Sequence, residues 1–259
     1  MKKMIMVKFG GAVLTNKASP CVIRKSVMKQ LGAELADFRK KSDTAVLLGN
    51  GGGSFGHYYA KKYHIVDKPS GTQALMGMCR GKNGNAFLNA ELVKVLLNFG
   101  IPANTFRIEQ FLEKECLEER MLSCLNYHML PVVYGDFLYQ INGSCRIVST
   151  EEIFFRLGEQ IANTPSCGYE LEKIIFCTDR DGVEDLHGNV IPVIWREDFA
   201  DWGIFQQPTE GYDVTGGMSE KVWMAFKMDC PVQVINGKKP GRLAQALKNE
   251  KTVGTIIQG

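Results

Sequence analysis

A run of glycines followed by a histidine is the part of this chain whose residue types and spacing most clearly suggest chemistry. The apolar run Val46–Leu48 leads into Gly49–His57, a segment with four glycines among its first five residues. Glycine lets a backbone approach a ligand with several N–H groups turned toward one point, and a helix start directly afterwards favours an anion. The pattern predicts a phosphate-binding loop, although a tight strand-to-helix turn without a ligand would have the same sequence.

Two common phosphate-binding motifs fit less well than this general pattern. Gly77–Asn83 approaches the P-loop motif GxxxxGK[ST], but it is one residue short and ends in Asn. Gly51, Gly53 and Gly56 satisfy GxGxxG, yet a dinucleotide-binding fold also requires an acidic residue about 20 positions further on. The first acidic residue, Asp67, comes earlier than that, so dinucleotide binding is kept only as an alternative.

Three lysines stand beside glycine-containing turns, where they could hold phosphate groups. Lys8 ends an apolar run and precedes Gly10–Gly11, Lys17 follows in the next loop, and Lys221 lies one turn into a predicted helix. Phosphoryl transfer asks a protein mainly for positioned groups and for charge stabilisation, which cations and glycine amides supply. The lysines are therefore candidate phosphate ligands, although any of them could instead be a solvated surface group.

The elements that must position these residues alternate between strand and helix patterns. Strand patterns fall at residues 4–9, 44–48, 131–134, 173–178, 231–235 and 254–257, with a hairpin pattern over 137–148. Helix patterns fall at residues 23–40, 85–97, 151–162, 219–228 and 242–248. Strands separated by helices predict an α/β fold with a mainly parallel sheet covered on both faces. Right-handed crossovers would then place the loops after the strands along one edge, where ligands bind.

Four segments in this order resemble the amino acid kinase family, and together they span nearly the whole chain. They are K-x-G-G at Lys8–Gly11, the glycine-rich loop at Gly49–His57, T-D-x-D-G-V at Thr178–Val183, and D-V-T-G-G-M-x-x-K at Asp213–Lys221. Within this family, G-G-G-S-F-G-H and D-V-T-G-G-M are most similar to isopentenyl phosphate kinases, and fosfomycin kinases come next.

The resemblance implies a three-layer αβα sandwich with two lobes. Residues 1–172 would bind the acceptor and form a homodimer, and residues 173–259 would bind ATP. The implied reaction transfers the γ-phosphoryl group of ATP, with Mg²⁺, to a small phosphate or phosphonate without a covalent enzyme intermediate. Isopentenyl phosphate is the leading acceptor, and a fosfomycin-type phosphonate or another small metabolite is the alternative. A second alternative is a protein of the same fold that senses a nucleotide or metabolite without catalysis.

The resemblance also assigns roles to individual residues. Catalytic roles would fall to Lys8, Lys17, His57 and Lys221. Contacts with ATP would come from Lys8, Gly10, Gly11, Ala12, Gly53, Asp179, Asp181, Gly216, Gly217 and Lys221. Contacts with the acceptor would come from Ala12, Gly52, Gly53, His57 and Thr150. Mg²⁺ would be held largely by phosphate oxygens and water rather than by a protein metal site. The two aspartates could instead cap a turn, and the histidine could be a structural one.

Two segments depart from the family pattern. Thr150 stands where the family has a glycine whose amide meets the acceptor phosphate, and a side chain there hinders close approach. The segment Cys79–Asn85 is polar and interrupted by glycines, which makes a poor wall for a prenyl tail. Both departures leave the kinase prediction in place, but the second weakens the prediction of an isoprenoid acceptor.

Composition narrows the class of protein further. A net charge of +3 gives no reason to expect a nucleic acid or a membrane surface as partner. The eight cysteines have no CxxC spacing and the four histidines are scattered, which argues against a zinc site. The apolar run before Lys8 is too short for a signal peptide, and no later run could span a bilayer. A reducing cytoplasm with free thiols is therefore the expected compartment.

Overall fold

The computed structural model describes residues 1–16, 19–65, 71–108, 117–139, 145–197, 217–228 and 230–258. Its central feature is an eight-stranded sheet with the order β3-β4-β2-β1-β7-β9-β10-β8. The strands are β1 (Lys2–Phe9), β2 (Ala45–Asn50), β3 (Ala103–Phe106), β4 (Leu130–Tyr134), β7 (Tyr169–Thr178), β8 (Val193–Trp195), β9 (Val232–Asn236) and β10 (Gly254–Gln258). All neighbours pair in parallel except β9 and β10, which confirms the predicted mainly parallel sheet.

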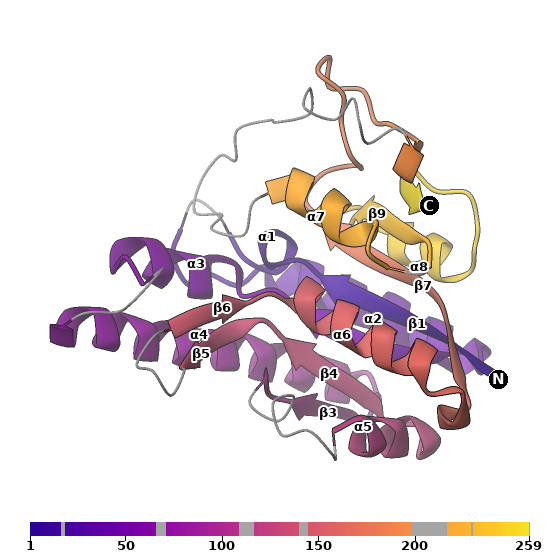
Figure 1. Cartoon of the computed structure of the whole chain (residues 1–259), viewed down its shortest axis with the longest axis horizontal. Helices are drawn as coiled ribbons and strands as arrows, with labels where there is room; N and C mark the ends of the chain where they lie inside the picture. Colours follow the sequence, from indigo (N-terminus) through magenta and orange to yellow (C-terminus); the bar gives the residue numbers. More distant parts are fainter. Residues whose placement is uncertain are drawn as a thin grey trace.

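Helices cover both faces of this sheet and complete a three-layer αβα sandwich (Figure 1). They are α1 (Gly11–Leu14), α2 (Lys25–Lys41), α3 (Gly53–Lys62), α4 (Gly71–Asn98), α5 (Leu117–Asn126), α6 (Thr150–Asn163), α7 (Gly217–Ala225) and α8 (Arg242–Leu247). None of the helices in the described residues combines the length and apolarity needed to cross a membrane.

Alternating residues of β1 build the two cores that hold the layers together. Met4 and Met6 are buried with residues of α5, α6 and α7. Ile5, Val7 and Phe9 are buried with residues of α1, α2, α3, α4 and α8. Successive side chains of a strand point to opposite faces of a sheet, so a central strand with both faces covered is apolar along most of its length. This explains the apolar run Met4–Val7 that precedes Lys8.

The helix α4 begins at Gly71, fourteen residues before the start that the sequence pattern predicted. The sequence pattern did not predict this start because Gly77 and Gly81 interrupt the apolar periodicity of the helix. A Cβ on Gly77 would lie 2.3 Å from the ring of Tyr63, and one on Gly81 would lie 2.4 Å from the ring of Phe137. The glycines therefore allow aromatic rings to pack directly on the helix backbone.

The predicted hairpin is present as β5 (Asp136–Tyr139) paired antiparallel with β6 (Cys145–Val148). Its turn at residues 142–143 lies outside the described residues. The short strand β3 and the helix α5 had no recognisable sequence pattern and were not predicted. The predicted lobe boundary at Lys173 falls inside β7, which pairs with β1 in the middle of the sheet. The assignment of acceptor and ATP to separate lobes stays a prediction.

Candidate active site

The predicted site residues follow three neighbouring strands that end at the same edge of the sheet. Phe9, the last residue of β1, stands in register with Asn50 of β2 and with Cys177 of β7. The backbone continues this pairing one residue further, because the amide of Gly10 donates to the carbonyl of Cys177 at 2.9 Å and the amide of Gly51 donates to that of Phe9 at 3.0 Å. Three of the four family-like segments therefore begin side by side.

The first two of these segments are in direct contact. A Cβ on Gly11 would lie 2.2 Å from the amide nitrogen of Gly53, so only glycine fits. Thr15 links the same two turns, because its hydroxyl donates to the carbonyl of Gly11 at 2.7 Å and accepts from the amide of Ser54 at 3.0 Å.

The helix bonds of α3 begin with the amides of Phe55 and Gly56, which donate to the carbonyl of Gly52 at 3.1 and 3.4 Å. The amides of Gly52 and Gly53 precede these bonds, and the helix start carries partial positive charge. This geometry suits an anion next to Gly52 and Gly53.

The buried Lys8 forms an ion pair with Glu151, the second residue of α6. Their side chains are only 10% and 7% exposed. Burial alone would raise the pKa of Glu151, but the positive charges of Lys8 and Lys221 hold the pKa below its ordinary value. The charges of two lysines that are more than two hundred positions apart in the sequence thus act on one carboxylate, which is ion-paired with Lys8. The structure brings together the two predicted catalytic lysines that it describes.

Glu151 is a candidate site residue that the sequence analysis missed. Its local pattern is that of a helix start: Ser149 caps α6 by accepting from the amide of Glu152 at 3.1 Å, and acidic residues in a first turn suit the helix dipole. Nothing in that pattern distinguishes Glu151 from its neighbour. Only the packing of α6 against the end of β1 reveals the difference.

Thr150 is buried beside the glycine-rich loop, as the resemblance implied, but its hydroxyl is already engaged within the protein. It donates to the carbonyl of Asn50 at 2.7 Å and accepts from the amide of Gly135 at 3.0 Å. These bonds join the ends of β2 and β4. The predicted contact of Thr150 with an acceptor therefore depends on its backbone amide.

The two aspartates after β7 differ in their surroundings. Asp181 accepts from the side-chain amide of Asn236 at 2.8 Å and from Arg242 at 2.9 Å. The hydrogen bond from Asn236, helped by the charge of Arg242, lowers the pKa of Asp181. These contacts connect the turn to β9 and α8, which is a structural role. Asp179 is partly exposed at the sheet edge, and a nucleotide contact by either residue stays a prediction.

The structure describes only some of the remaining predicted residues. His57 is half-buried in the second turn of α3, and Ala12 lies half-buried in α1. Gly217 begins α7. Lys17 and Gly216 lie outside the described residues, so their roles stay predictions.

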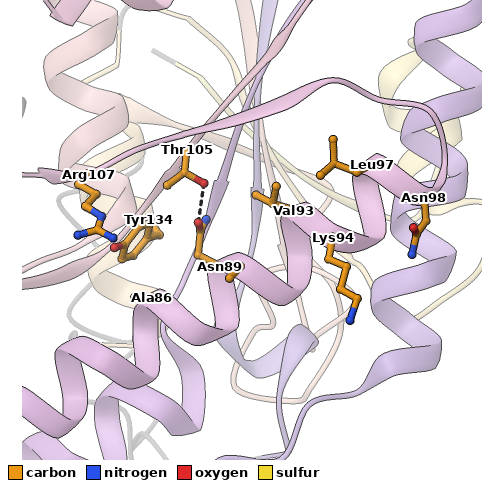
Figure 2. Close-up of a pocket in the computed structure, with 10 residues that line it drawn as sticks. Ala86, Asn89, Val93, Lys94, Leu97, Asn98, Thr105, Arg107 and Tyr134 are labelled. Atoms are coloured by element: carbon orange, nitrogen blue, oxygen red, sulfur yellow. Dashed lines mark hydrogen bonds between the residues drawn. The ribbon is translucent and has the colours of Figure 1, made fainter.

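A groove of about 520 Å³ lies away from these residues, between α4 and the ends of β3 and β4. Figure 2 shows Arg107 and Tyr134 at one end and Lys94 and Leu97 toward the other. Within it, the hydroxyl of Thr105 donates to the side-chain oxygen of Asn89 at 2.7 Å. No predicted site residue lines this groove, so it is a surface separate from the candidate active site.

Comparison with known proteins agrees with the fold and identifies the family. The model of the amino acid kinase family matches residues 3–236. The isopentenyl phosphate kinase of Methanothermobacter thermautotrophicus is 28% identical over 279 residues, covering 99% of each chain. That of Methanocaldococcus jannaschii is 25% identical over 260 residues, covering 95% of this chain and 96% of the relative. A solved isopentenyl phosphate kinase superposes with a TM-score of 0.75 at 23% identity, covering 98% of this chain and all of the other. The structural match supports the fold.

Proposed function

The chain belongs to the amino acid kinase family and is a phosphotransferase, and we propose that it transfers the γ-phosphoryl group of ATP to isopentenyl phosphate. The observation that carries this proposal is the buried ion pair of Lys8 with Glu151, next to two touching glycine turns and within the field of Lys221. Because the chain belongs to the amino acid kinase family, dinucleotide binding is no longer kept as an alternative.

The residues fit a reaction that needs positioning and charge. Lys8 and Lys221 would stabilise the negative charge that spreads over the transferred group, while the ion pair with Glu151 holds Lys8 in place. The amides at the start of α3, with His57 one turn later, would hold the phosphate already present on the acceptor. ATP brings Mg²⁺, which neutralises part of the charge on its phosphates. An acceptor phosphate is ionised near neutral pH, so the proposal requires no strong base.

Isopentenyl phosphate is the proposed acceptor because the relatives that match the full length carry that activity in their names. A polar feature beside the glycine-rich loop favours keeping a fosfomycin-type phosphonate as second candidate: Lys82 and Asn85 of α4 contact the buried Asp136. Lys82 is the partly exposed member of this group, and a hydrocarbon tail placed against its ammonium would strip it of water without replacing the lost hydrogen bonds.

The experiment that tests the proposal is coupled measurement of ADP release with isopentenyl phosphate, dimethylallyl phosphate and fosfomycin, each varied against saturating ATP. We expect turnover with isopentenyl phosphate and its loss in Lys8→Met, which keeps the length of the side chain but removes its charge. Failure to turn over any of the three above background ATPase would refute the acceptor assignment. ATP binding by calorimetry without consumption would then favour the sensing alternative.

We further propose that the chain acts as a homodimer in the cytoplasm. All seven cysteines in the described part of the chain are free thiols, which suits a reducing compartment. The terminal strand β3 and the groove beside it offer a face on which a second copy could lie.

A further inference from the structure

Asn85, in the middle of α4, is a buried polar side chain whose oxygen has no hydrogen-bond partner among the described residues. The residue is 3% exposed. Its amide nitrogen donates to Asp136 Oδ1 at 3.0 Å. A carboxylate accepts and never donates, so this bond fixes which end of the amide faces the aspartate. The oxygen of Asn85 must therefore face the other way.

On that other side lies the glycine-rich loop. A Cβ added to Gly52 would come within 2.3 Å of Asn85 Oδ1, and one added to Gly56 within 2.7 Å. The oxygen is thus seated against two glycines that flank the start of α3. The oxygen of Asn85 accepts no hydrogen bond from the described residues, so it braces the loop by packing against it. The loop amides that the proposed function assigns to the acceptor phosphate are therefore not used by Asn85.

The carboxylate of Asp136 accepts hydrogen bonds from two residues of α4 and so ties the hairpin to that helix. It is 2% exposed, and its second oxygen accepts from Lys82 Nζ at 3.3 Å. Lys82 also donates to the carbonyl of Phe137 at 3.0 Å. The ring of Phe137 in turn packs on Gly81, the residue before Lys82. The hairpin, α4 and the glycine-rich loop are therefore joined through one carboxylate.

We propose that Asn85 and Asp136 are positioning residues for the acceptor: Asp136 orients the amide of Asn85, and Asn85 sets the start of α3 that carries the amide donors and His57. The role in acceptor binding rests on the proposed function, whereas the bracing of the loop does not. Neither residue touches the reacting phosphates. Both residues act through the loop, so substituting either one should weaken acceptor binding and leave ATP binding unchanged.

Three substitutions test this, with a matched control on the same helix. Asn85→Leu keeps the volume and removes the amide, and Asn85→Ala guards against a misfit of the branched side chain. Asp136→Asn keeps an oxygen that accepts from Asn85. The control is Leu88→Ala, which removes a fully buried side chain from the core that also contains Phe55 of α3. It therefore reports what loss of packing alone does to the same segment.

Two readouts are measured on the full-length protein. In steady-state kinetics we expect both Asn85 variants to raise the KM for isopentenyl phosphate about tenfold, with the KM for ATP unchanged. Leu88→Ala should leave the acceptor KM near that of the unmodified protein. Asp136→Asn, which keeps an oxygen for Asn85 but loses the charge that pairs with Lys82, should raise the acceptor KM less than the Asn85 variants do. In hydrogen exchange of the free protein, amides of residues 51–57 should exchange faster in the Asn85 variants than in Leu88→Ala.

The two readouts separate this inference from the proposed function. If the unmodified protein phosphorylates no acceptor, the proposed function fails, and the exchange comparison alone decides whether Asn85 braces the loop. Exchange of residues 51–57 equal to that of Leu88→Ala would overturn the bracing role. An acceptor KM equal to that of Leu88→Ala, or an equal rise in the KM for ATP, would overturn the positioning role.

Discussion

Lys8 and Glu151 are two charged side chains buried where β1 ends and α6 begins. Taking charges out of water is costly, and removing one member of a buried pair leaves the other uncompensated. A pair of this kind is weak evidence for added stability. It is better explained by the need to keep a lysine ammonium in a fixed place beside the glycine turns.

Glu151→Ala should therefore impair both catalysis and stability. We expect kcat to fall at least about tenfold and the free energy of unfolding to fall by about 3–5 kcal/mol, because the buried Lys8 loses its ion-pair partner. The matched control is Glu152→Ala, whose partners Arg146 and Arg156 are partly exposed. That change should cost about 0–1 kcal/mol and leave kcat unchanged. Equal kcat in the two variants, by steady-state assay, would contradict the role of Glu151.

The pH dependence of stability gives an independent check on Glu151. Its pKa in the folded protein lies below the ordinary 4.5, since Lys8 and Lys221 outweigh the effect of burial. The folded state then binds fewer protons than the unfolded state, so this contribution is complete above about pH 4.5 and is lost as pH falls through the folded-state pKa. Urea unfolding across that range should show the advantage of the unmodified protein over Glu151→Gln shrinking toward low pH. A constant difference would speak against the pairing.

His57 and Lys221 should affect different kinetic constants. His57→Ala removes a donor to the acceptor phosphate, so it should cost about 1.5–3 kcal/mol in kcat/KM, mainly through the KM for the acceptor. Lys221→Ala should lower kcat, because it removes an interaction that strengthens in the transition state. Steady-state kinetics with ATP and acceptor varied in turn separate the two. Unchanged acceptor kinetics in His57→Ala would leave this histidine a structural residue.

At the residue scale, the sequence pointed to candidate side chains where the local pattern is distinctive. Lys8 and Lys221 each follow or precede glycines at a recognisable spacing, and in the structure the charges of both act on one carboxylate. Glu151 and Asn85 have no such pattern. Their roles depend on contacts between β1, α6 and α7, or between α4 and the glycine-rich loop, which no local stretch of sequence encodes.

Among the elements, α4 shows how glycine can mislead a prediction from sequence. A glycine in a helix costs about 1 kcal/mol relative to alanine, and several of them suggest an interruption. Here the rings of Tyr63 and Phe137 occupy the space that side chains at positions 77 and 81 would need. Tertiary packing outweighs local preference, and the helix runs through.

Two helix glycines make a matched test of this explanation. Gly81→Ala should lower the free energy of unfolding by about 1–3 kcal/mol, because the new methyl would meet the buried ring of Phe137. Gly158→Ala, in α6, should raise it by about 0.5–1 kcal/mol, since its nearest neighbour, on Leu171, lies at an ordinary 3.5 Å. Denaturant unfolding of both variants decides. A stabilised Gly81→Ala would show that Phe137 can move aside.

Elements with a distinctive pattern of their own were predicted well whatever their length, as the four-residue strands β5 and β6 show, and elements without such a pattern were not. The central strands are continuous apolar runs, so their pattern survives without any knowledge of neighbours. The four-residue β3 has two polar residues among Ala103–Phe106. It is a strand because β4 pairs with it, which is information that lies outside its own sequence.

For the whole molecule, the expected homodimer needs a face large enough to bury about 1,000 Å² or more. The terminal strand β3 is one edge of the sheet, and such edges are ready to pair or pack unless protected. Leu97, which lines the adjoining groove, is 53% exposed. We therefore place the proposed interface on this edge.

Leu97→Arg should convert a dimer into a monomer. Light scattering should give about twice the chain mass of 28.9 kDa for the unmodified protein and the single mass for the variant. Leu186→Arg is the control, because Leu186 is similarly exposed, at 60%, but lies in the connection between β7 and β8. A monomeric unmodified protein, or dissociation by the control alone, would remove this interface.

The continuous pairing of β2, β1 and β7 has a consequence for how two substrates could meet. Neighbouring strands lie about 4.8 Å apart, so the ends of β2 and β7 are separated by two such steps, about 10 Å. The glycine-rich loop follows β2, and the turn that contains Asp179 and Asp181 follows β7. If acceptor and nucleotide bind where we propose, backbone hydrogen bonds fix the spacing of their binding segments. The gap that a phosphoryl group must cross would then be set during folding and would not depend on closure of one lobe upon the other.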